Sequence, residues 1–277
     1  MERKFIWLLA LLLAPGTALA APECLPRYPT PASMASMFDV AQATAESLDA
    51  LEDVDVALLA RGGQDLSKYG LRHSHLALAL RDDDGQWRVV HLLNHCKSST
   101  STLFREGLGN FIGETGTHTD IRVGVPTPEL RAALHTLLTG DGATAKALHE
   151  PRYSVVAFPF SLEYQNSNQW VLEVLVAAMQ QAEQGNTIST RRQAQSYLRA
   201  YRYKPSILHI GVGKRLGARF FAANAATTDH PGSERISGNY SVVRVESVFD
   251  FLQQHDLLAQ ELSVAHVPVA GMAAPQP

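Results

Sequence analysis

At residues 164–170 the chain reads YQNSNQW, and the apolar run VLEVL follows at once. From Trp170 onward the apolar residues recur at helical spacing, which predicts a buried helix that ends near Gly185. The preceding Asn-Ser-Asn at residues 166–168 contains the residue types that best cap a helix start. A side chain at that start meets free backbone N–H groups and the positive end of the helix dipole. The stretch is therefore a candidate seat for a nucleophile or an anion, although ordinary helices begin in the same way.

The first twenty residues have the features of a secretory signal peptide. Basic residues at positions 3 and 4 precede an apolar run over residues 5–14, and Ala18-Leu19-Ala20, with small residues at its first and third positions, forms a cleavage site. The apolar run is shorter than the about 20 residues that cross a bilayer. We expect cleavage after Ala20 and a mature protein that is periplasmic or secreted, with no stable membrane span after cleavage.

The composition of the remaining chain is that of one globular domain. Residues 21–260 are predicted to form a single α+β domain, and residues 261–277, rich in Ala, Pro and Val, a disordered tail. A net charge of −3 gives no reason to expect nucleic acid or an anionic membrane as a partner. The sequence leaves the oligomeric state open.

The chain contains two cysteines, Cys24 and Cys96. An exported protein meets an oxidising compartment, so a disulfide between them is the favoured interpretation. A catalytic Cys96 is the weaker alternative, because no helix start follows it. Two thiols are too few for a structural zinc site, and we predict no metal and no cofactor.

Residues 71–94 predict a β-hairpin. Two apolar runs, LALAL and VVHLL, flank the acidic turn DDDG. Pairing the strands around that turn brings His75 roughly opposite His91, and we favour His75 as the functional imidazole. His91 could be its polar partner or a hydrogen-bonded structural histidine. The following glycine- and threonine-rich residues 103–125 predict a long irregular loop or flap with short strands.

Asp229 and His230 form a second pair of interest, in a polar loop. A carboxylate beside an imidazole can orient the ring, but adjacent side chains usually point apart. Their role is left open.

A polar residue at a helix N-terminus, a histidine at a strand start and a polar residue on the next strand are the parts of a papain-like hydrolase site. Residues 56–63, then Ser74-His75-Leu76-Ala77-Leu78, then residues 87–93, resemble the opening of circularly permuted NlpC/P60-type proteins. The resemblance implies a permuted papain-like α+β fold, with an antiparallel sheet packed against helices. More specifically, the chain resembles a bacterial exported family known as "domain of unknown function 2145", which carries no assigned activity. The features that carry this resemblance, over most of residues 24–260, are His75, residues 165–170, Asp229-His230-Pro231 and Ser247-Val248-Phe249.

The resemblance implies that Ser167, His75 and His91 form the catalytic group, with Ser167 where a cysteine hydrolase has Cys. Substrate or oxyanion contacts then fall to the backbone at the helix start and to Gln165, Asn166, Asn168 and Trp170. A serine hydroxyl is far less acidic than a thiol of pKa about 8.5, so it reacts only with a true general base. Two functions remain: a hydrolase of amide or ester bonds in a cell-wall peptide or acyl group, or an inactive papain-like fold that binds a cell-wall or lipid ligand.

Overall fold

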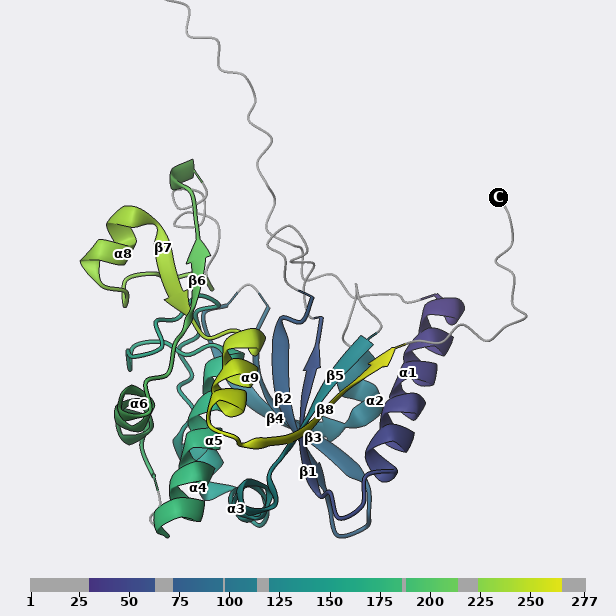
Figure 1. Cartoon of the computed structure of the whole chain (residues 1–277). Helices are drawn as coiled ribbons and strands as arrows, with labels where there is room; N and C mark the ends of the chain where they lie inside the picture. Colours follow the sequence, from purple (N-terminus) through teal and green to yellow (C-terminus); the bar gives the residue numbers. More distant parts are fainter. Residues whose placement is uncertain are drawn as a thin grey trace, which may run out of the picture.

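A six-stranded antiparallel sheet forms the centre of the protein (Figure 1). The structure is a computed structural model, and it describes residues 30–62, 72–96, 98–113, 120–185, 188–213 and 224–265. The strand order is β4-β3-β2-β1-β5-β8. The strands are β1 (Val56–Arg61), β2 (His75–Arg81), β3 (Trp87–Asn94), β4 (Ser101–Gly107), β5 (Asp120–Pro126) and β8 (Leu258–Ala265).

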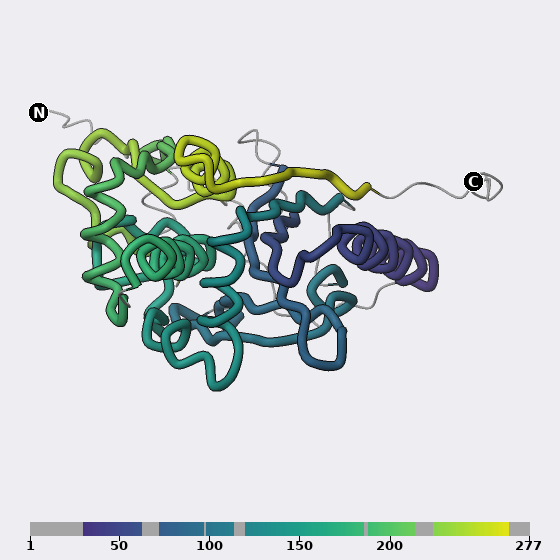
Figure 2. The backbone as a smooth tube through the Cα atoms, turned by 60° about the horizontal axis from the view of Figure 1, so that its bottom comes forward, coloured from purple at the N-terminus to yellow at the C-terminus, as the bar shows by residue number. Residues whose placement is uncertain are grey.

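Helices cover both faces of this sheet, as Figure 2 shows for α1 and α5. One face carries α1 (Pro31–Asp49) and α2 (Leu108–Gly113). The other carries α3 (Pro128–Leu138), α4 (Ala143–Ala147), α5 (Ser167–Gln184), α6 (Arg191–Ala200) and α9 (Val245–Gln254). Successive strand residues point to opposite faces, so the even-numbered Leu58 packs under α5 while the odd-numbered Leu59 packs towards α1. The expected α+β class, with an antiparallel sheet packed by helices, is confirmed.

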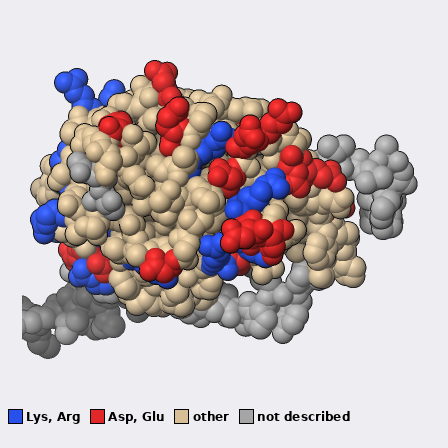
Figure 3. Space-filling model, turned by 90° about the horizontal axis from the view of Figure 1, so that it is seen from below, with Lys and Arg blue, Asp and Glu red and all other residues tan. Residues whose placement is uncertain are grey.

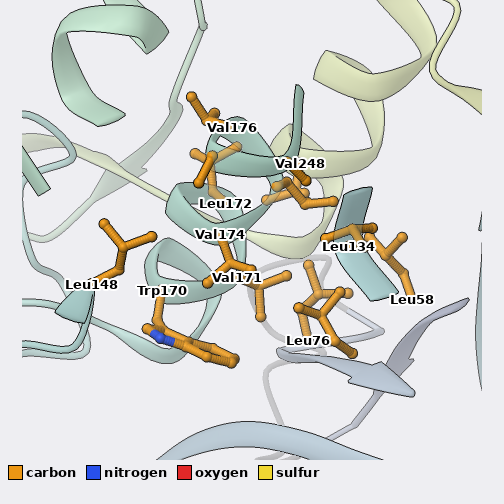
Figure 4. Packing of buried hydrophobic residues seen from close by; sticks show 14 of the residues in the cluster. Leu58, Leu76, Leu134, Leu148, Trp170, Val171, Leu172, Val174, Val176 and Val248 are labelled. Atoms are coloured by element: carbon orange, nitrogen blue, oxygen red, sulfur yellow. The ribbon is translucent and has the colours of Figure 1, made fainter. Parts of the chain in front are cut away.

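The helix predicted after residue 166 is α5, and it lies in the middle of the larger core (Figure 4). Every residue from Ser167 to Met179 is buried. The Asn166 side chain accepts a hydrogen bond from the Gln169 backbone N–H as the N-cap, and Gly185 ends the helix at φ +65°. Full burial of each large apolar side chain contributes about 1.5–3 kcal/mol. The position of Ser167 is therefore fixed by one of the most deeply packed elements of the fold.

The predicted hairpin is also confirmed. β2 pairs with β3 in the register Leu78↔Val90, and Gly85 in the turn has φ +79°. The expected irregular loop over residues 103–125 is partly wrong, because β4 is a regular strand paired with β3. This correction matters for the site, since β4 carries Glu106.

A smaller unit lies beside the main sheet. The strands β6 (Ser206–His209) and β7 (Asn239–Val242) pair with each other, and α8 (Gly232–Ser237) packs next to β7. Tyr240 and Val242 of β7 form a separate apolar cluster with Val156. The segment that precedes α5 therefore packs, through Val156, against β7.

Three predictions concern the chain ends. The disordered tail was expected from residue 261, but Glu261 to Ala265 belong to β8 and pair with β5. The prediction was wrong because this strand is stabilised by a partner that lies far away in the sequence. The signal peptide and Cys24, hence the Cys24–Cys96 disulfide, lie outside the described residues and stay predictions. Each helix in the described part is too short or too polar to span a bilayer.

The end of the molecule with the β2–β3 turn has a mixed charge. Figure 3, which looks at the lower end of Figure 1, shows acidic and basic side chains interspersed there. Arg88 pairs with Asp82 at 2.7 Å, and Arg81 pairs with Asp49 at 2.6 Å. Exposed pairs of this kind contribute at most about 1 kcal/mol each, so they serve solubility more than stability.

Candidate active site

Three of the predicted site residues lie in one continuous line. Ser167, the first residue of α5, has its Oγ 3.2 Å from Nδ1 of His75, the first residue of β2. His75 Nε2 lies 2.9 Å from His91 Nδ1 on β3. The structure therefore brings together the hydroxyl, the imidazole and the polar partner that the sequence analysis had placed on three separate elements.

The line continues to a residue that the sequence analysis missed. His91 Nε2 lies 3.0 Å from Glu106 Oε1 on β4, at an angle outside hydrogen-bond geometry. Glu106 lies within the glycine- and threonine-rich region 103–125 that was expected to be irregular, and its pairing with Val89 on β3 reveals its position.

Burial and a neighbouring cation keep both imidazoles neutral. Burial, the Arg61 charge and the neighbouring His91 hold the pKa of His75 well below its usual value. Burial and the same Arg61 lower the pKa of His91 to about 3. Arg61 is buried beside them, with its guanidinium 4.7 Å from the centre of the Phe111 ring. A neutral His75 is in the state required of a general base at neutral pH.

Tyr153 approaches the serine from a second side. This residue is buried in the larger core, and burial raises the pKa of its hydroxyl to about 12 while a hydrogen bond with the Ser167 side chain lowers it. The phenol therefore keeps its proton and can donate to Ser167 Oγ. If it does, the serine hydroxyl is left to donate to His75 Nδ1. Nothing in the local pattern around Tyr153 distinguished it from an ordinary strand aromatic.

Asn168 fixes the backbone on both sides of His75. Its Oδ1 accepts a hydrogen bond from the Leu76 N–H at 2.9 Å, and its Nδ2 donates to the Ser74 carbonyl at 3.3 Å. These contacts join the start of β2 to the start of α5. The expected contact of the Asn168 side chain with a substrate is replaced by a positioning role, because its amide is used within the protein.

The Gln165 and Asn166 amides are also used within the protein. Gln165 donates to Glu173 Oε2 at 2.7 Å and to the Leu148 carbonyl, while Asn166 caps α5 and donates to two backbone carbonyls. The expected oxyanion contacts of these side chains are therefore wrong for this arrangement. Both amides hold the helix start in place.

Trp170 needs a similar correction. It is fully buried, and its indole N–H donates to the Ala145 carbonyl at 3.0 Å. Figure 4 shows the ring among the side chains of the larger core. Trp170 is thus a core residue, and its side chain is not placed for the expected substrate contact.

Beneath the helix start lies a buried ionic network. Arg191 Nε donates to Glu173 Oε2 at 2.8 Å, and the same guanidinium donates to the carbonyls of Ser161 and Tyr164. Burial raises the pKa of Glu173, and the Arg191 charge opposes that rise. The network ties the segment before Ser167 to α6.

Backbone N–H groups remain as donors for an anion. The N–H groups of Gln169 and Trp170 bond to Asn166, whereas those of Ser167 and Asn168 have no acceptor among the described residues. Both lie at the N-terminus of a helix of 18 residues, where the dipole favours negative charge. One belongs to the residue that carries the hydroxyl and the other to the next residue, so both are candidate donors to an oxyanion.

The pair Asp229 and His230, whose role the sequence left open, lies elsewhere. His230 Nε2 is 2.6 Å from the Val156 carbonyl and Nδ1 is 2.7 Å from Glu234 Oε2. Asp229 Oδ2 accepts from the Phe158 N–H. Both side chains hold the small β6–β7 unit to the segment that precedes α5.

Sequence comparison assigns the family. The profile of a bacterial family described as "Uncharacterized protein conserved in bacteria (DUF2145)" matches residues 47–252. The chain belongs to the DUF2145 family. The matched range of this DUF2145 protein includes Ser167, His75, His91 and Glu106. The comparisons with curated proteins and with solved structures give no match.

Proposed function

We propose that this DUF2145 protein is an exported hydrolase of amide or ester bonds, with Ser167 as nucleophile and His75 as general base. The observation that carries the proposal is the 3.2 Å approach of Ser167 Oγ to His75 Nδ1 at the start of a buried helix. A nucleophile and base within hydrogen-bond reach, with the base oriented by a third group, are the requirements for covalent catalysis. His91, 2.9 Å from the far nitrogen of His75, is that third group.

The reaction follows from this geometry. As Ser167 Oγ attacks the carbonyl carbon, its proton passes to His75 Nδ1, and the carbonyl oxygen becomes an oxyanion beside the N–H groups of Ser167 and Asn168. His75 then returns the proton to the departing amine or alcohol, which leaves an acyl-serine ester. Water attacks that ester, gives one proton to His75 and releases the acid, and the proton on His75 returns to Ser167. An oxyanion donor contributes about 2.7–4 kcal/mol.

A permuted papain-like architecture is the fold that we propose for this chemistry. The supporting observations are the helix that begins with the nucleophile and the antiparallel sheet that carries the histidines. The histidine strand precedes the nucleophile helix in this chain, as the resemblance to permuted NlpC/P60-type proteins implies. On this basis the expected substrate is a cell-wall peptide or an acyl group.

A fluorophosphonate probe, which reacts with activated serines, tests the nucleophile directly. The full mature protein should be labelled at Ser167, and S167A and H75A should lose the labelling while keeping the far-ultraviolet circular dichroism of the wild type. The matched control is S101A, since Ser101 is also buried with an imidazole nitrogen, His149 Nε2, at 3.1 Å, but lies in a strand. Labelling that survives S167A would refute the assignment.

The second candidate is a ligand-binding protein without catalysis. What favours it is the burial of the reacting groups, because Ser167 is 6% exposed and His75 is 7% exposed, together with a hydroxyl in place of a thiol. The variant S167C separates the two functions. If His75 acts as a general base, the thiol of S167C should react with iodoacetamide faster than the thiol of S167C/H75A. Equal rates, combined with no fluorophosphonate labelling of the wild type, would favour the binding protein.

A further inference from the structure

Glu106 stands at the end of a diagonal that crosses three neighbouring strands. In the registers of the sheet, His91 on β3 is opposite Phe104 on β4, and Glu106 is two residues further along β4. Residues two apart on a strand point to the same face, so Glu106 and His91 share one face. That face is covered by α2, whose Phe111 ring lies 5.3 Å from the His91 ring.

The direction of the hydrogen bonds along this line decides whether the site can react. An uncharged imidazole donates from one nitrogen and accepts at the other. If His75 Nδ1 accepts from Ser167, then His75 Nε2 carries the proton and donates to His91 Nδ1. His91 Nε2 must then carry a proton and face an acceptor. In the opposite direction, His75 Nδ1 would donate to Ser167 and could not take its proton.

A carboxylate removes this ambiguity. An ionised Glu106 only accepts hydrogen bonds, and it lies 3.0 Å from His91 Nε2. A small rotation of the carboxylate would align the pair, and it has room, because Glu106 lines a pocket of about 460 Å³ together with Met37, Phe38, Gly109, Asn110 and Gly113. With the pair aligned, the proton of His91 is fixed on Nε2, and the direction of every other bond follows.

We propose that Glu106 is a positioning residue, which fixes the tautomers of His91 and His75 so that Ser167 faces an acceptor nitrogen. The effect of Glu106 on the reactivity of Ser167 rests on the proposed function, whereas its effect on the tautomers of His91 and His75 does not. In a serine triad, a wrong histidine tautomer costs about 10⁴-fold in rate. Loss of Glu106 should therefore slow the fluorophosphonate labelling of Ser167 by between about 10-fold and 10⁴-fold.

Nitrogen-15 NMR of the full mature protein at neutral pH tests the tautomers, with the imidazole signals assigned by their loss in H75Q and H91Q. We expect both wild-type rings to carry their proton on Nε2. In E106Q the amide can either donate or accept, so a second tautomer should appear for both rings and labelling should slow. In E106D an acceptor is retained, so the wild-type tautomers should persist and labelling should be partly restored.

The outcomes separate the two proposals. A wild-type His75 protonated on Nδ1, or an E106Q protein with unchanged tautomers and unchanged labelling, would overturn the role of Glu106; the wild-type spectrum gives this result even if E106Q does not fold. Wild-type tautomers as expected, with a shift in E106Q but no labelling of Ser167, would support the positioning role and refute the hydrolase.

Discussion

Among the residues that the structure describes, the buried histidines lie in two clusters, and their nitrogens face different partners. At His75, one nitrogen faces a hydroxyl and the other faces a second imidazole, and each of these groups can either donate or accept. At His230, one nitrogen faces the Val156 carbonyl and the other the Glu234 carboxylate, and both are acceptors.

This difference separates a general base from a structural cross-link. A base needs one nitrogen that is free to accept a proton, and of these two clusters the His75 cluster can provide it. The His230 cluster instead joins the loop at Val156 to α8, and Glu234 extends the connection to Ser241 on β7. Burial is common to both rings, so burial by itself does not identify a catalytic histidine.

The most direct way to break this comparison is to replace each ring by glutamine. H75Q removes the base, and we expect the rate of Ser167 labelling to fall by about 10²–10⁴-fold with little change in stability. H230Q removes the ring that joins the Val156 carbonyl to Glu234 and should lower the free energy of unfolding by about 1–3 kcal/mol, while labelling in the folded protein persists. Urea denaturation and labelling rates on both variants measure the two effects. Loss of labelling in H230Q with normal labelling in H75Q would contradict the roles assigned to the two rings.

The ionic network under α5 extends the comparison to a third polar cluster. Glu173 is fully buried and pairs with Arg191, so E173A leaves a buried guanidinium without its partner. Breaking such a pair costs about 3–5 kcal/mol. We expect urea denaturation to show a loss of this size. The control E183A removes an exposed carboxylate that accepts from Tyr197 near the other end of α5, and it should cost far less. Equal losses would contradict the importance of burial.

The sequence predicted the site through local patterns and failed where contacts depend on the order of the strands. The Asn-Ser-Asn start of α5 and the hairpin around Gly85 both have strong local signals, and their order along the chain placed Ser167 and His75 in the same site. Glu106 could not be recognised, because its role depends on β4 lying beside β3. A pattern also cannot show which of several polar side chains is used within the protein, so Gln165, Asn166 and Asn168 were assigned to a substrate.

Asn168 gives an intermediate test, because it links the histidine strand to the nucleophile helix. N168A loses both hydrogen bonds to the backbone around His75, and we expect a cost of about 1–3 kcal/mol in stability and slower labelling of Ser167. N168D keeps the acceptor for the Leu76 N–H but places an oxygen beside the Ser74 carbonyl. If positioning is what matters, both variants should slow labelling more than the control N239A, whose amide contacts the exposed His209. Unchanged labelling in N168A would remove Asn168 from the positioning contacts.

The smallest expected effect is a shift in pH dependence, and it tests the neutral state of His75. The Arg61 charge is one of the causes that lower the pKa of His75, so its removal in R61Q should raise that pKa. Labelling requires the neutral ring and is lost as the pH falls through this pKa. The acidic limb of the rate profile should therefore move to higher pH in R61Q and stay near the wild-type position in R61K, which keeps the charge. A limb that moves equally in both variants would assign the effect to the packing of Arg61 on Phe111, and a limb that moves in neither would show that burial alone keeps the base neutral.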